Sequence, residues 1–408
     1  MNLLSTESTY LLHLFACWLK QVPPDAPPEG FSYPQFTAVT FRSGLSNMIL
    51  GALTMLREPF SFDYSLWKNN VIKTVSNEFY RRESMFMLLD YMEKNNCPLI
   101  IIKGVVISNN YPKPEYRVSV DIDAIYAGST PETALDLLRN YGFEVNYDIK
   151  DHHYICKKPG IGILELHTQL FNHGYSENWL GSVNVADYIH LTSIPVEIEG
   201  RTIHSLAHTD HFLYIVLHSF KHFMSVGSNF RMMADTIIFA HANAGDIDWA
   251  RAYKLLDELS LRQFVMTLFT IGEKHLLLDM AKIPGYEAVM ESMTEALIND
   301  LFDTTERQDY SAISNSLFFG LSQKTLKKIY SSKFRYILHY MFSKNNFSAP
   351  RYSYLKKRAW LLPVAWIHRI FYNLFARKKK TTLLNESKLA RHQFSEHVEL
   401  LKKLKVIK

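Results

Sequence analysis

The sequence has few cysteines and no long apolar run. Cys17, Cys97 and Cys156 are its only cysteines, and no two of them have the CxxC spacing of a zinc or redox motif. This excludes a disulfide scaffold and a zinc ribbon, and it is typical of proteins in a reducing cytoplasm. No uninterrupted stretch of about 18 apolar residues is present, which argues against a polytopic membrane protein. Tyr10–Leu19 is apolar, but no basic residue precedes it, so we expect no secretory signal here.

Positive charge is concentrated in the last part of the chain. Residues 324–408 hold 21 Lys and Arg against three acids, so this segment carries about +18. Since the whole chain carries +5, the first 323 residues carry about −13. This separation indicates a polyanionic partner for the basic segment, either RNA or an anionic membrane surface. The alternative is that the segment packs against the acidic body. We expect a cytoplasmic protein, with peripheral association at the inner face of the membrane as a further option.

The composition is that of a folded protein, with 47% hydrophobic and 13% aromatic residues over a length that suits two to three domains. Short β-branched runs alternate with helical periodicity in the middle of the chain, which predicts an α+β, α-rich fold with a small mixed sheet. The expected parts are a helical N-terminal region (1–96), a mixed core (97–204), a helical domain (205–323) and a basic helical module (324–408). Strands are predicted at 98–103, 118–126, 153–158, 161–170 and 195–203. Helices are predicted at 41–56, 65–95, 131–141, 209–224, 230–243, 248–260, 262–279 and 285–302.

Two aspartates in one predicted strand are the most informative feature. Side chains alternate between the two faces of a strand, so Asp121 and Asp123 share one face. Two carboxylates so close repel each other, and a divalent cation would neutralise both. The alternative is an edge strand with a solvated acidic face. Because of the repulsion, replacing either aspartate by asparagine is expected to leave stability unchanged or to raise it.

A second predicted strand adds a third acid. Alternation in 161–170 places Ile163, Glu165 and His167 on one face. We expect hairpin pairing to bring Glu165 beside the two aspartates. Three carboxylates on adjacent strands form a site for two Mg²⁺ ions. His167 would orient Glu165 or contact substrate, and a satisfied core histidine is the alternative.

Lys103 ends the first predicted strand, and Gly104 follows it and precedes an apolar helical segment that is expected to reach Tyr111. Glycine allows close approach of the backbone to a ligand, and a helix N-terminus offers free N–H groups to phosphate. An ordinary turn is the alternative.

These motifs stand in an order that resembles a bacterial nucleotidyltransferase family of the DNA polymerase beta-like superfamily. The motifs are Ile102-Lys103-Gly104, Arg117-x3-Asp121-x-Asp123 and Glu165-Leu166-His167, followed by His218-x3-His222, Arg231-x3-Asp235 and Asp246-Ile247-Asp248-Trp249. The resemblance runs from about Glu83 to His275. It departs at the first motif, because the superfamily usually has Gly-Ser or Gly-Gly there and a shorter spacing to the aspartates. Ser108 or Ser119 would then replace the usual serine contact with phosphate.

The resemblance implies a nucleotidyltransferase core at 97–204 and transfer of a nucleoside monophosphate from an NTP, such as ATP, with release of pyrophosphate. Asp121, Asp123 and Glu165 would be the catalytic residues and would bind two Mg²⁺ ions, or Mn²⁺ in their place. The implied nucleotide-binding residues are Lys103, Gly104, Arg117, Ser119 and His167. Lys103 and Arg117 would neutralise phosphate charge, Arg117 through its bidentate donors.

The acceptor is a hydroxyl group on a glycan precursor, an RNA or a protein. Similar proteins are often associated with surface polysaccharide biosynthesis, and a related branch contains toxins that modify tRNA. A catalytically silent nucleotide- or RNA-binding module of the same fold is the alternative function.

Three further patterns have a structural or a functional interpretation. His218 and His222 are one helical turn apart and would suit zinc, but the sequence lacks the HExxH pattern. Arg231 and Asp235 have the spacing of a helical ion pair. The apolar segment 358–377 is flanked by basic residues, which suits an interfacial helix, an RNA contact or buried packing.

Overall fold

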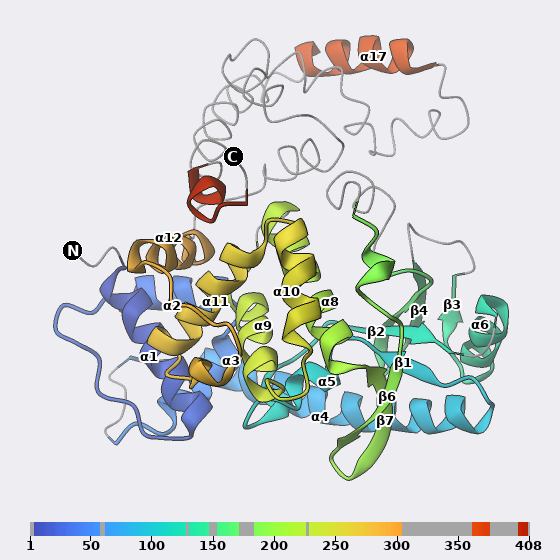
Figure 1. Cartoon of the computed structure of the whole chain (residues 1–408), viewed down its shortest axis with the longest axis horizontal. Helices are drawn as coiled ribbons and strands as arrows, with labels where there is room; N and C mark the ends of the chain where they lie inside the picture. Colours follow the sequence, from blue (N-terminus) through green and yellow to red (C-terminus); the bar gives the residue numbers. More distant parts are fainter. Residues whose placement is uncertain are drawn as a thin grey trace.

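The middle part of the chain forms a seven-stranded mixed sheet in the computed structural model, and Figure 1 shows this sheet to the right of most of the helices. The structure describes residues 4–57, 62–127, 130–146, 153–170, 183–225, 228–303, 361–375 and 399–406. The strand order is β3-β4-β5-β2-β1-β7-β6. The strands are β1 (Leu99–Ile101), β2 (Asp121–Tyr126), β3 (Glu144–Val145), β4 (His153–Lys158), β5 (Gly162–His167), β6 (Ser193–Ile198) and β7 (Arg201–Leu206).

The pairing of β2 and β5 differs from the sequence expectation. β4 and β5 form the predicted hairpin. The single strand expected at 195–203 is wrong, because the chain turns at Glu199 and Gly200 and forms a second hairpin from β6 and β7. β5, however, pairs with β2 in parallel, and β1 pairs with β2 in an antiparallel manner. Glu165 therefore reaches the aspartates through a parallel ladder and not through a hairpin. The helix-rich α+β fold with a mixed sheet is confirmed.

The N-terminal region is helical, as predicted, with one difference. Ser5 caps the first helix, since its side chain accepts a hydrogen bond from the Ser8 amide. The single helix expected at 41–56 is wrong, because Gly44 ends one helix at a φ of 74° and a second helix follows. The helices are α1 (Thr6–Lys20), α2 (Tyr33–Ser43), α3 (Ser46–Leu53) and α4 (Ser65–Lys94).

Short helical segments lie between the strands. The predicted helix at 131–141 is confirmed as α6 (Pro131–Asn140), capped by Thr130. The helical segment expected to reach Tyr111 is a single turn, α5 (Val105–Ser108). Among the described residues, 3-10 segments lie between strands at η1 (Pro114–Tyr116) and η2 (Val185–Asp187), and η3 (Met280–Lys282) follows the sheet.

The chain after the sheet forms α8 (His208–Ser225), α9 (Phe230–Ala242), α10 (Trp249–Glu258), α11 (Arg262–His275), α12 (Glu291–Phe302) and α17 (Leu362–Phe375). Two predicted boundaries are wrong, because α11 ends at His275 and α12 begins at Glu291. Most of the basic module 324–408 lies outside the described residues. In the described part of the chain, no helix combines the length and the hydropathy that crossing a membrane requires.

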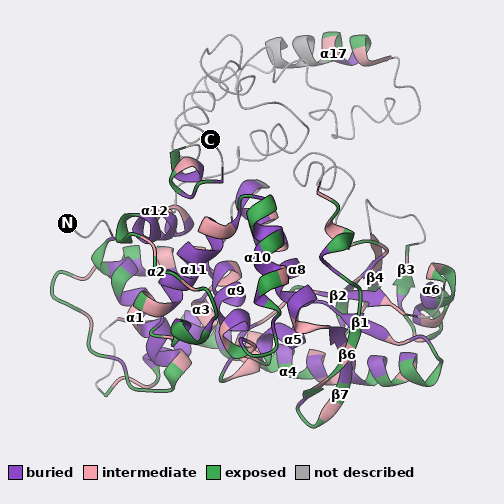
Figure 2. Cartoon of the chain, in the orientation of Figure 1, coloured by how far each residue is buried: buried purple, intermediate pink, exposed green. Residues whose placement is uncertain are grey.

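The two faces of the sheet pack into two different hydrophobic cores. Leu99, Ile101, Ala124, Leu164 and Leu166 point to one face, where they pack with apolar residues of α4 and α6. Burying a side chain of this size contributes about 2 kcal/mol. Figure 2 shows the buried residues along these central strands and along the helices around them.

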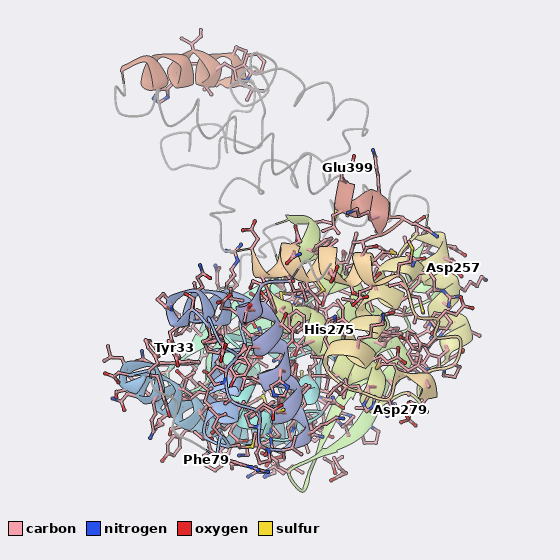
Figure 3. The ribbon with its side chains drawn as sticks, turned by 90° about the vertical axis from the view of Figure 1, so that its left-hand side faces the viewer. Tyr33, Phe79, Asp257, His275, Asp279 and Glu399 are labelled. Carbon is pink, nitrogen blue, oxygen red and sulfur yellow. The ribbon has the colours of Figure 1, made fainter. Side chains whose placement is uncertain are left out.

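The opposite face of the sheet joins a larger core. Ile100, Ile102 and Ile125 pack there with α8 and α9, and the N-terminal helices belong to the same core. Leu400, Leu401 and Leu404 are also part of it. Figure 3 shows Glu399, which begins this last described segment, beside the helical body. The N-terminal helices and the helices after the sheet thus share one interior, while the four-part division of the chain stays a prediction.

Candidate active site

Three carboxylates converge on the face of the sheet that is turned toward α8. Asp123 on β2 stands directly opposite Glu165 on β5 in the parallel ladder, and Asp121 lies two residues earlier on the same face. One ligand oxygen from each lies within 4.8 Å of the others. A hard divalent cation prefers carboxylate oxygens in such an arrangement. The donor set therefore fits Mg²⁺ or Mn²⁺.

These carboxylates line a cavity of about 380 Å³ between the sheet and two helices. From α8, Tyr214, His218 and His222 reach the cavity, and from α9, Arg231 and Asp235 do so. The cavity also contains residues from the loop before β2, among them Arg117 and Ser119. The motifs between Lys103 and Asp235, which lie far apart along the chain, thus meet around one space, whereas the motif at 246–249 contributes no residue to the lining of this cavity.

Asp123 is held by two cationic or polar partners. Its carboxylate is 2.8 Å from Lys103 Nζ and 2.9 Å from His167 Nε2, and its side chain is only 1% exposed. Burial by itself raises the pKa of Asp123, but the charge of Lys103 and the contact with His167 outweigh burial, so the pKa lies well below its ordinary value. Asp123 is therefore ionised at every physiological pH.

The pKa of Glu165 is shifted in the opposite direction to that of Asp123. Burial and the negative charges of Asp123 and Asp121 raise its pKa above the ordinary value. His153 Nε2 and His167 Nε2 each lie 3.8 Å from one of its oxygens. A carboxylate with a raised pKa is a better proton acceptor than an ordinary one.

Gly104 shapes the turn that carries Lys103 into the cavity. Its φ of 64° lies in the region that favours glycine, and it precedes the single turn of α5. A Cβ at this position would meet only Ser119 Oγ at 3.8 Å and Asp121 O at 4.0 Å, so backbone conformation and not space requires the glycine. Lys103 Nζ also lies 3.3 Å from His218 Nε2.

Arg117 directs its guanidinium at a buried aspartate. Its Nε and Nη2 donate to the two oxygens of Asp235 at 3.0 and 2.7 Å. Its Nη1 donates to Ser119 Oγ and reaches the Gly104 carbonyl at 3.5 Å. Tyr111 and Arg231 bind Asp235 as well, so the predicted ion pair between Arg231 and Asp235 is present, at 3.2 Å. This network fixes the loop that carries Ser119 and precedes Asp121.

The histidines of the site fall into two groups. Burial and the charge of Lys103 lower the pKa of His218 well below its ordinary value and that of His222 to about 4, so both rings are neutral. Within the described residues, neither belongs to a group of three side chains that could hold a metal ion. His153, in contrast, opens β4, where the predicted strand at 153–158 begins, and it reaches the cavity. The alternation of the hairpin could have identified it, because His153 pairs with His167. His152 lies outside the described residues.

A mixed sheet with three convergent carboxylates beside a Lys-Gly turn is the arrangement expected of a nucleotidyltransferase. The family model described as uncharacterised nucleotidyltransferase matches residues 31–276, which is more than half of the chain. The chain belongs to this family and is a nucleotidyltransferase. No curated protein and no solved structure gives a significant match.

Proposed function

We propose that the protein transfers a nucleoside monophosphate from an NTP to a hydroxyl acceptor and releases pyrophosphate, with Mg²⁺ bound by Asp121, Asp123 and Glu165. The observation that carries this proposal is the convergence of these three carboxylates within 4.8 Å. Bound Mg²⁺, or Mn²⁺, would supply charge neutralisation for the triphosphate and Lewis-acid activation of the reacting oxygens.

At the α-phosphorus, the reaction forms one bond and breaks one. The acceptor oxygen bonds to the α-phosphorus, and the bond from that phosphorus to the bridging oxygen breaks, so that pyrophosphate leaves with the electron pair. Glu165 takes the hydroxyl proton, because burial and the negative charges of Asp123 and Asp121 raise its pKa above the ordinary value. Asp123 stays ionised throughout.

In this account Lys103 has two interaction partners, Asp123 and the phosphates of the nucleotide. Without nucleotide its ammonium is paired with Asp123 at 2.8 Å. A divalent cation bound at Asp123 would neutralise this carboxylate, and the ammonium of Lys103, which lines the cavity, would then be available to the phosphates. Gly104, Ser119 and His167 are proposed nucleotide contacts.

Arg117 acts mainly as a positioning residue in this proposal. Two of its donors bind Asp235, which leaves Nη1 as the group nearest to Ser119 and the Gly104 carbonyl. Direct contact of Arg117 with phosphate stays a prediction.

A silent nucleotide-binding module is the second candidate, and the pairing of Lys103 with Asp123 is the observation that favours it. An ammonium at 2.8 Å from a metal-binding carboxylate competes with a cation for that carboxylate. Calorimetry with ATP, GTP, CTP and UTP, with and without Mg²⁺, separates the two functions when pyrophosphate release is measured in parallel. Binding without pyrophosphate release in broad acceptor mixtures would support the silent module.

The acceptor can be found by labelling. Incubation of the protein with labelled NTPs and cell extract should label one class of molecule, and Asp121→Asn should abolish this labelling. Asp136→Asn is the matched control, because Asp136 is a half-exposed acid on α6 outside the cavity. A glycan precursor, an RNA or a protein is the proposed acceptor, and an anionic membrane or RNA is the proposed partner of the basic module 324–408. Labelling that persists in Asp121→Asn would contradict the proposal.

A further inference from the structure

A second group of metal-ligand types adjoins the three carboxylates in the same cavity. His153 on β4 and His167 on β5 are paired across the antiparallel ladder, and Glu165 lies on the same face of β5. One ligand atom from each of His153, Glu165 and His167 lies within 4.8 Å of the others. The side chains are 17%, 25% and 4% exposed, so the group is sheltered but opens to the cavity.

The spacing within this group suits a shared cation better than direct hydrogen bonds. Glu165 Oε1 is 3.8 Å from His153 Nε2, and Glu165 Oε2 is 3.8 Å from His167 Nε2. Both distances exceed the usual range of an N–H···O hydrogen bond. Donors bound at about 2.1 Å to one tetrahedral ion lie roughly 3.4 Å apart. The ligand atoms of this group lie within 4.8 Å of one another, so the three side chains would have to move closer together to hold one ion.

The chemistry of the donors separates this group from the neighbouring one. Two imidazoles and a carboxylate favour Zn²⁺, Mn²⁺ or another transition-metal ion, whereas an all-oxygen set favours Mg²⁺. Glu165 belongs to both groups and could bridge them. We propose that His153, Glu165 and His167 form a second cation site that takes a transition-metal ion, next to the oxygen-only site of Asp121, Asp123 and Glu165. This inference extends the proposed function and rests on it only through the shared Glu165.

Occupation of this site requires a rearrangement at His167. Its Nε2 lies 2.9 Å from Asp123 Oδ1, so this contact lengthens or is replaced when the ring nitrogen turns to a cation. His153 lies outside the oxygen-only group, and its Nε2 faces Glu165. His153→Gln is therefore the informative substitution, because it removes a nitrogen ligand and leaves the three carboxylates in place.

Pulsed electron paramagnetic resonance of Mn²⁺ added to the tag-free full-length chain tests the site directly. We expect ¹⁴N couplings from histidine in the wild type, and we expect these couplings to change when the histidines are labelled with ¹⁵N. His153→Gln should lose part of the nitrogen coupling, and its affinity for Zn²⁺ should fall at least about tenfold. Asp121→Asn should keep the nitrogen coupling. His204→Gln on β7 is the matched control, since His204 pairs with Glu93 outside the cavity and should change neither quantity.

The outcomes separate this inference from the proposed function. Bound Mn²⁺ without any ¹⁴N coupling, or no bound Mn²⁺ at all, overturns the histidine-containing site. A nitrogen-free Mn²⁺ signal that disappears in Asp121→Asn leaves the proposed function standing. Nitrogen-coupled Mn²⁺ in a chain that releases no pyrophosphate supports the site and contradicts the proposed function. Since the isotope experiment needs only the wild-type chain, the test holds even if His153→Gln fails to fold.

Discussion

Lys103 Nζ and Asp123 lie 2.8 Å apart in the cavity, where the aspartate side chain is only 1% exposed. Lys103 follows the end of β1, which pairs with β2 in an antiparallel manner, and the Ile102 amide next to it donates to the carbonyl of Asp123. An ion pair between a candidate phosphate-binding lysine and a candidate metal-binding aspartate links the two halves of the proposed reaction. Metal binding at Asp123 should therefore change phosphate binding at Lys103, and phosphate binding at Lys103 should change metal binding at Asp123.

Lys103→Gln should uncouple metal binding from nucleotide binding. The substitution leaves the buried carboxylate of Asp123 without its ammonium, which should lower the free energy of unfolding by about 3 kcal/mol. A divalent cation can replace the lost charge, so Mg²⁺ should raise the melting temperature more in this variant than in the wild type. NTP affinity, measured by calorimetry, should fall. Lys157→Gln on exposed β4 surface is the control, and an unchanged response to Mg²⁺ in Lys103→Gln would contradict the coupling.

The two aspartates should differ in their effect on stability. Asp123→Asn removes the charge that holds Lys103 and His167, so we expect a loss of about 2 kcal/mol in the free energy of unfolding. For Asp121 no side-chain ion pair or hydrogen bond is found within the described residues, and Asp121→Asn should leave the melting temperature near that of the wild type. The expectation from charge repulsion is unchanged or raised stability for both substitutions. From the structure we expect instead that Asp123→Asn lowers stability and that Asp121→Asn leaves it nearly unchanged.

The pH dependence of the Asp123 contribution follows from its lowered pKa. A carboxyl with a folded pKa below its unfolded value stabilises the fold above the unfolded value, about 3.9, and loses this contribution as pH falls through the folded pKa. The stability difference between the wild type and Asp123→Asn should therefore be full at pH 7 and shrink below about pH 4. Chemical denaturation at several pH values measures it, and a difference that grows toward acid pH would contradict the assignment.

Glu165→Gln should stabilise the metal-free protein. The raised pKa of Glu165 means that its ionised form costs stability above the folded pKa, and this cost disappears as pH falls through that pKa. The variant should melt above the wild type at pH 7, and the two should converge toward pH 4. Added Mg²⁺ should reverse the order, because only the wild type retains the third carboxylate. Equal Mg²⁺ responses would show that Glu165 does not bind the cation.

The buried network around Asp235 should be sensitive to geometry. Arg117→Lys keeps the charge but loses the bidentate contact, so the free energy of unfolding should fall by about 2–3 kcal/mol. The double variant that combines Arg117→Lys with Asp235→Asn should lose less free energy of unfolding than the sum of the losses in the two single variants. Strict additivity in this double-mutant cycle would show that the pair contributes no coupling. An NTP affinity that falls in Arg117→Lys without a change in melting temperature would instead indicate direct phosphate contact.

Much of the site could be predicted from local patterns, because alternation along a strand depends only on backbone geometry. It placed Asp121 with Asp123 and Glu165 with His167. The parallel pairing of β2 with β5 could not be read from the sequence, since it depends on the packing of the whole sheet. The contact of Lys103 with Asp123 likewise depends on a register between two strands, and the break at Gly44 interrupts an apolar periodicity that otherwise continues.

The most direct test of the central claim compares two labels on the same nucleotide. The protein is incubated with cell extract and either an α-phosphate-labelled or a γ-phosphate-labelled NTP in the presence of Mg²⁺. The account predicts that only the α-label enters the acceptor, that the γ-label leaves as pyrophosphate, and that Asp121→Asn and Glu165→Gln prevent both. Transfer of the γ-label, or α-label incorporation that survives loss of either carboxylate, would contradict it.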